Sequence, residues 1–418
     1  MKHPFLPIAL LVASPVLAQD IPLDTAIARA LRHERFAEAR SIVADMGTLR
    51  NREVGSSWYP QLQLNAQSTI QNEQIAFPAT LPGFAPPEVP LDFHRVLVNF
   101  SQTVYDGSTT KARRRLEQLD SDQQDLTLAR RELDLRGQVT QRYMAVLLAE
   151  AQEQLVELRK GTLQEQRQRL VSAVEAGAAL GADSAALAAE WITADQEAVQ
   201  VRHTVERLRD ELRTLTDDAR MTTSSFMVPD DTTIAEGSAA QRPDIRAFDL
   251  RMQALDAQSD LALGGRLPKV RVFGNAGYGD PGYNTFNEEW RPMLLAGIGL
   301  EWRILDWGSR RRNDHLLDLQ HELLQQDKDH LMEQWDIALA AQRRNIRQDR
   351  ELVATDDRLV ALRGQVSAAK AEQLANGTIT ASEYITELNK EHAARLGREV
   401  HRLQAVLAVR TYNDIQGK

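Results

Sequence analysis

The chain has 418 residues, no cysteine and a formal net charge of −9. Without cysteine it has no disulfide, zinc–thiolate site, iron–sulfur cluster, cysteine nucleophile or lipid-modified cysteine, and its acidic balance argues against a nucleic-acid-binding surface. With 26% charged and only 6% aromatic residues, the composition favours long helices.

Residues 1–18 have the pattern of a secretory signal peptide. Lys2 and His3 precede an apolar run from Phe5 to Leu17, and the small residue Ala18 offers a cleavage point. The run is too short to cross a bilayer as a helix. We therefore expect an exported protein, whose mature chain begins with helices in residues 19–57.

Two pairs of segments alternate apolar and polar residues over about ten positions, which is typical of transmembrane β-strands. A half-buried soluble sheet shows the same alternation, but the aromatic residues cluster at the strand ends, as in the girdles of membrane proteins. We predict β-hairpins of a membrane barrel at 58–106 and 267–306. The apolar positions expected to face lipid are Val96, Val98, Phe100, Ala296, Ile298 and Leu300.

Long proline-free stretches follow each strand pair and repeat apolar residues every seven positions. One heptad series begins at Leu119, and another runs from Leu317 to Val366, which is coiled-coil spacing. Each stretch ends near a glycine, Gly177 or Gly377, after which a second helix returns. The pattern predicts two long helical hairpins.

The same elements occur twice, about 200 residues apart, which indicates a tandem duplication. Matching landmarks are residues 58–64 and 266–272, Asp106 and Asp306, and Gly177 and Gly377. The predicted order is signal peptide 1–18, N-terminal helices 19–57, β-hairpin 58–106, helical hairpin 107–217, linker and helix 218–266, β-hairpin 267–306 and helical hairpin 307–418.

Four strands are too few to close a membrane barrel, since single-chain bacterial barrels have at least about eight. An open sheet edge in lipid costs several kcal/mol for each unpaired backbone group. The fold class we predict is therefore mainly α with a β-barrel part, in which a trimer closes twelve strands on an α-helical tunnel. Two copies would also satisfy closure.

The order of these features resembles the TolC-like outer membrane efflux protein family. The passage Gln241-Arg242-Pro243-Asp244-Ile245, leading to Leu267-Pro268, matches a family pattern. The resemblance covers essentially the whole mature chain. It implies a homotrimeric channel in the bacterial outer membrane, in contact with its lipid and extended into the periplasm. Its implied partners are a periplasmic adaptor and an inner-membrane pump, proton-driven or of the ATP-binding-cassette class, that together export drugs, metals or proteins.

The resemblance also suggests where the channel narrows and where the adaptor binds. The hairpin tips at Gly177, Gly377 and Thr378 are expected to contact the adaptor. Glu383, six positions after the second glycine, and its first-half equivalent Asp183 are candidates for an acidic ring at the periplasmic aperture.

This sequence departs from its relatives at the aperture. Thr386 stands where some relatives have a second acidic residue, and Ile379 where some have a basic one. Asp183 and Glu383 also have a simpler explanation of equal weight, because acidic residues are favoured in the first turn of any helix.

We predict no enzyme activity, and no catalytic, cofactor or metal site. Gly277–Gly282 fits a dinucleotide-binding spacing, but Pro281 interrupts it and no helix follows, so a hairpin loop is expected. Two other functions stay open: the outer-membrane component of a type I protein secretion system, and a periplasmic coiled-coil structural or adhesion protein.

Overall fold

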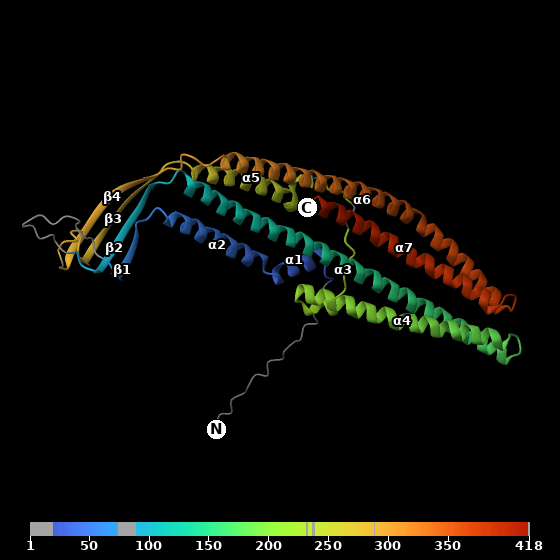
Figure 1. The fold of residues 1–418 in the computed structure, drawn as a ribbon. Coiled ribbons are helices and arrows are strands. Elements are labelled where there is room, and N and C mark those ends of the chain that lie inside the picture. Colours follow the sequence, from blue (N-terminus) through green and yellow to red (C-terminus); the bar gives the residue numbers. More distant parts are fainter. Residues whose placement is uncertain (1–19, 74–88, 231–232, 236–238, 288, 417–418) are drawn as a thin grey trace, which may run out of the picture. The chain divides into compact units, whose positions relative to one another are not determined.

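The computed structural model describes residues 20–73, 89–230, 233–235, 239–287 and 289–416 (Figure 1). The expected signal peptide, residues 1–18, lies outside them. Among the described residues, no helix is both long and apolar enough to cross a membrane.

The first half of the chain runs from short helices through two strands into two long helices. Its elements are α1 (Leu23–His33), α2 (Phe36–Ser56), β1 (Gln61–Ile70), β2 (Asp92–Tyr105), α3 (Thr109–Glu175), α4 (Gly181–Thr216) and the 3₁₀ turn η1 (Ala219–Thr222).

The second half repeats this order. Its elements are the 3₁₀ turn η2 (Ala239–Gln241), α5 (Pro243–Gly264), β3 (Lys269–Asp280), β4 (Arg291–Glu301), α6 (Ser309–Ala375) and α7 (Ala381–Ile415). Helices α3 and α6 are both 67 residues long and begin at equivalent positions, Thr109 and Ser309.

The chain divides into two compact units. The sheet unit comprises Ala39–Thr127 and Pro243–His330, and it contains the four strands. The hairpin unit comprises the rest, including Leu128–Arg242 and Leu331–Lys418, and it contains most of the long helical hairpins.

The sheet has the strand order β1-β2-β3-β4 and is antiparallel throughout (Figure 1). Val98 lies opposite Leu64 on β1 and Ala276 on β3, and Ala276 lies opposite Leu294 on β4. Directly opposite residues share a face, so the alternating apolar positions of all four strands form one apolar face. The six positions expected to face lipid all belong to it, and their contact with lipid stays a prediction.

The other face of the sheet includes glycines where strands approach closely. A Cβ atom at Gly277 would overlap the carbonyl oxygen of Val96 on the neighbouring strand. Gly277 lies inside β3 and not in the expected hairpin loop. Close backbone packing between strands requires this glycine.

An aspartate makes the turn from strand to long helix in each half. The Asp106 carboxylate accepts hydrogen bonds from the backbone N–H groups of Ser108 and Thr110, at 2.9 and 2.7 Å. Asp306 accepts them from Gly308 and Arg310, at 3.1 and 3.0 Å. Each aspartate pairs N–H groups that a helix start leaves without intrahelical partners.

The heptad series follows the buried seam of α3 closely, whereas on α6 of the single chain it departs from the buried positions. Leu119 and Leu126 are buried, whereas Leu359 and Val366 are 45% and 40% exposed. On a straight helix, residues seven positions apart are offset by about 20° around the helix axis. Over seven heptads, the row of heptad positions therefore turns by roughly 140°. The buried positions of α6 are instead Ile346, Asp356, Ser367 and Leu374.

Arg242, the residue before α5, holds the end of α7. Its guanidinium donates hydrogen bonds to the carbonyl oxygens of Asp414 and Ile415, at 3.0 and 3.2 Å. It also lies 3.9 Å from the ring centroid of Trp335 on α6. One side chain therefore satisfies helix-end carbonyls and joins α6 to α7.

We predict that Arg242→Ala lowers the free energy of unfolding by about 2 kcal/mol, because the carbonyls lose their donor and the cation–π contact disappears. Arg242→Lys should lose less. Thermal melting of the purified protein in detergent, followed by circular dichroism, measures both. Arg347→Ala, at an exposed position of α6, is the control; an alanine variant at Arg242 that melts with the wild type would contradict this role.

Candidate functional site: the hairpin tips and the cavity behind them

Each helical hairpin turns at a left-handed glycine. Gly177 has φ +73° and Gly377 has φ +68°. The N–H of Ala178 donates to the Ala173 carbonyl at 2.7 Å, and the N–H of Thr378 donates to the Gln373 carbonyl at 3.0 Å. These bonds close the C-terminal ends of α3 and α6 in the same way, and the backbone conformation favours glycine.

The two tips share one apolar core within the hairpin unit. Its buried members are Leu163, Leu170, Leu187, Ala194, Leu374, Ala381, Tyr384 and Leu388. Tyr384 is only 1% exposed. Because α3, α4, α6 and α7 all contribute, the tips pack as one body.

Asp183 caps the helix of the other hairpin. Its carboxylate accepts a hydrogen bond from the N–H of Ala381, the first residue of α7, at 2.9 Å. The hydroxyl of Thr380 accepts one from the N–H of Glu383 at 3.3 Å. A negative charge beside the positive end of α7 is also electrostatically favourable.

Glu383, the other candidate aperture residue, remains open to solvent. Its side chain is 56% exposed and lies 4.0 Å from the ammonium of Lys370. The structure thus brings both acids to the start of α7 in different environments, one as a cap and one as an exposed charge. Their arrangement in a ring stays a prediction.

The residues expected to bind an adaptor lie on the exposed tip loops. Gly177, Gly377 and Thr378 are exposed. The Thr378 hydroxyl donates to the Gln373 carbonyl at 2.9 Å, so this side chain supports the loop locally. Leu180, on the first tip, is 68% exposed although apolar. A contact of these residues with another protein stays a prediction.

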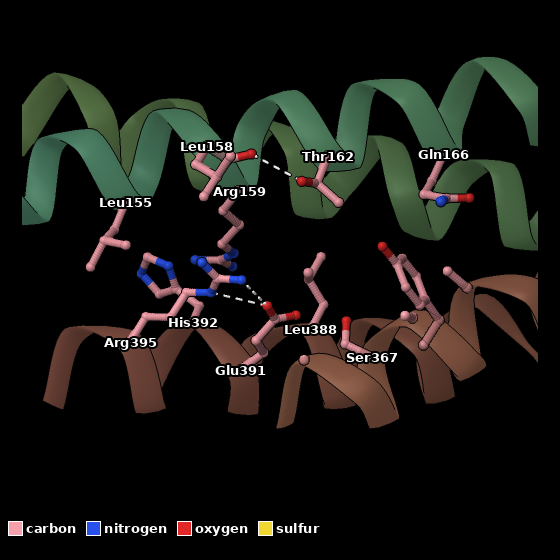
Figure 2. Close-up of a pocket in the computed structure, with 14 residues that line it drawn as sticks. Leu155, Leu158, Arg159, Thr162, Gln166, Ser367, Leu388, Glu391, His392 and Arg395 are labelled. Carbon is pink, nitrogen blue, oxygen red and sulfur yellow. Dashed lines mark hydrogen bonds and ion pairs between the residues drawn. The ribbon is translucent and has the colours of Figure 1, made fainter. Parts of the chain in front are cut away.

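Behind the tips, a cavity of about 280 Å³ lies between α3, α6 and α7 (Figure 2). Leu155 and Leu388 contribute apolar walls. Figure 2 shows Arg159 from α3 gathered with His392 and Arg395 from α7 at one end. The cavity therefore combines an apolar lining with a charged end.

Arg159 is the centre of a buried polar network. Its side chain is 10% exposed and pairs with Glu190 and, at 3.0 Å, with Glu197, both on α4. Asn389 on α7 donates to Glu190 at 3.0 Å. The network joins α3, α4 and α7 through charge, and removing Arg159 would leave Glu190 and Glu197 without the cation that they share.

His392 borders this network in its neutral form. Burial, together with the nearby charge of Arg159, lowers the pKa of the imidazole below its ordinary value. Its Nε2 atom is buried and has no hydrogen-bond partner among the described residues. The ring therefore packs as a neutral group at neutral pH.

A family model described as outer membrane efflux protein matches residues 51–217. Over these residues, which are less than half of the chain, the sequence is similar to that family. No curated protein matches it in sequence.

Solved structures share the fold over nearly the whole chain. The outer membrane protein VceC from Vibrio cholerae is 13% identical with a TM-score of 0.72, covering 93% of this chain and 95% of its own. The CmeC outer membrane channel of Campylobacter jejuni is 13% identical, TM-score 0.75, covering 100% and 93%. The open state of the Neisseria gonorrhoeae MtrE channel is 15% identical, TM-score 0.69, covering 94% and 88%. At such identities the likeness establishes the fold.

Sequence reasoning located the tips, but it missed the network of Arg159, Glu190 and Asn389. The only signal in the sequence was a set of charged residues on these helices. Without the structure, charged residues that face a neighbouring helix cannot be told from charged residues that face solvent.

We predict that Asp183→Ala loosens the start of α7 by about 1 kcal/mol, which corresponds to roughly fivefold faster local hydrogen exchange. Exchange followed by mass spectrometry on peptides covering residues 378–388 measures this. The control is Asp195→Ala on α4, which removes an ion pair with Lys160 of α3. It should leave the exchange rates of those peptides unchanged. Identical exchange in the Asp183 variant and the wild type would show that the cap does not hold α7.

Proposed function

We propose that three copies of the chain close a twelve-stranded barrel that continues into a periplasmic tunnel, forming the exit duct of a tripartite efflux system for small molecules. The observation that carries this proposal is the four-stranded sheet with one exposed apolar face. In an efflux family, such a sheet joined to long helical hairpins fits a membrane pore with a periplasmic conduit.

The sheet edges support the oligomer. Among the described residues, the outer edges of β1 and β4 have no strand partner. Backbone groups in lipid must be paired within protein. Pairing β4 of one copy with β1 of the next satisfies both edges, and rotation about a threefold axis closes the ring.

The apolar face supports contact with outer-membrane lipid. Ile298 and Leu300 are 76% and 68% exposed, although both are large and apolar. Val96, Val98, Phe100 and Ala296 lie on the same face by strand register. An apolar surface of this kind is suited to hydrocarbon.

The tips are the proposed contact with the rest of the export machinery. Gly177, Gly377 and Thr378 would meet a periplasmic adaptor, and the energy would come from an inner-membrane pump, proton-driven or ATP-binding-cassette. At the aperture, three copies of Glu383 would concentrate negative potential and favour cations. The Asp183 cap would hold the two hairpins together until the channel opens.

A charge on the lipid face should impair membrane assembly. We expect Val98→Arg and Ile298→Arg to lose most of their heat-modifiable trimer, because an arginine near the bilayer midplane costs about 2–4 kcal/mol. Asn99→Arg, the neighbour of Val98 on the opposite face, is the matched control. Trimer yields equal to wild type in both lipid-face variants would contradict the barrel assignment.

Reconstitution into planar bilayers tests the duct itself. The wild type should form cation-selective channels, and Glu383→Gln should lower the cation-over-anion preference by about twofold or more, because each trimer loses three charges. Asp357→Asn, which alters an 83% exposed carboxylate on α6, should preserve it. Absence of any conductance would contradict the duct, whereas unchanged selectivity would contradict only the role of Glu383.

A further inference from the structure

We propose that His392 makes the packing between the two helical hairpins sensitive to pH, so that acidification loosens the tips and favours the open channel. This inference rests on the proposed function, because opening of the channel is its physiological readout. It assigns a role to a buried titratable group that neither the tips nor the sheet explains.

The position of His392 connects it to the tips. It follows Tyr384 and Leu388 on α7, both members of the apolar core of the tips. All three residues line the cavity between α7 and α3 (Figure 2). A change in the packing of His392 therefore acts on the same contact that holds the tips together.

The carboxylates around His392 are already engaged. Glu197 and Glu190 on α4 pair with Arg159 of α3. On α7 itself, Glu391 pairs with Arg395 at 2.6 Å. The α6 residues that line the cavity, Gly364, Ser367, Ala368 and Ala371, are uncharged. A proton on His392 would thus add a positive charge beside Arg159 and Arg395, and the carboxylates nearest to it already bond to these guanidinium groups.

The sign of the effect follows from the two states of the ring. In the packed state, burial and Arg159 hold the pKa of His392 below the ordinary value of 6.5. Once the hairpins separate, water solvates the ring and its pKa returns toward that value. Above about pH 6.5 both states are neutral, and below it the separated state binds more protons. The packed state consequently loses stability as the pH falls through 6.5.

A second histidine on α7 lies at another contact with α6. His401 lies 2.9 Å from the carboxylate of Asp356, which is 8% exposed. His203 on α4 is 73% exposed and pairs with Glu206, so it reports only general effects of acid.

Open probability in planar bilayers at pH 7.5 and pH 5.5 tests the proposal. The wild type should open more often at the lower pH, by up to about tenfold for each copy of His392, because pH 5.5 lies one unit below the pKa of the solvated ring. His392→Gln, which cannot gain a proton, should lose this response. His203→Gln and His401→Gln should both keep it. An unchanged response in His392→Gln would overturn the inference while leaving the duct intact.

Hydrogen exchange gives a readout that does not depend on conductance. Peptides covering residues 384–395 of the wild-type trimer in detergent should exchange faster at pH 5.5 than at pH 7.5, after correction for intrinsic rates. His392→Gln and His392→Met should both remove the difference, so the test survives if one variant folds poorly. If no channel conducts but this difference is present, the proposed function fails and the pH-sensitive contact stands. Equal corrected exchange at both pH values in the wild type would overturn it.

Discussion

Backbone N–H and C=O groups find no water inside a bilayer, so each must be paired within protein. The four strands satisfy this requirement along β2 and β3 and leave β1 and β4 with open outer edges among the described residues. In the proposed trimer, those edges are what join one copy to the next. The duplication supplies a hairpin from each half, and the pairing of β2 with β3 merges the halves into one sheet. Each long helix begins directly after a strand, where Asp106 or Asp306 accepts hydrogen bonds from the first N–H groups of the helix.

The two halves use the same turns but differ at the tips. Both hairpins close on a left-handed glycine. The start of α7 receives side-chain caps from Asp183 and Thr380, whereas the start of α4, at Leu180, has no side-chain cap. The duplicated sequence has therefore diverged so that an acid of the first hairpin supports a helix of the second. This converts two similar hairpins into one interdependent pair.

The sequence predicted local features well, because these depend on spacing. Alternation along the strands predicted which residues share a face, and Gly177 and Gly377 predicted the turns. Over many turns of α6, the heptad series departs from the buried positions of the single chain because a small angular drift accumulates. The sequence suggests that Asp183 either stabilises the start of its own helix or belongs to an acidic ring. In the structure it accepts a hydrogen bond from Ala381, which lies 198 positions away in the chain. No local pattern reveals such a contact, and the same applies to Arg159 with Glu190 and Asn389.

In the proposed channel, the polar network behind the tips is part of a contact that would separate on opening. Burying an ion pair contributes little net stability compared with apolar packing of the same volume, because both charges lose water. Arg159 with its glutamates therefore fixes the register of α3, α4 and α7 without binding them as tightly as an apolar seam would. When the helices separate, the charges and the ring of His392 regain solvation, which offsets part of the lost contact. An apolar seam has no such compensation on opening. In the proposed channel, the apolar core at the tips would therefore stabilise the closed state, and the polar network behind it would lower the free-energy cost of opening.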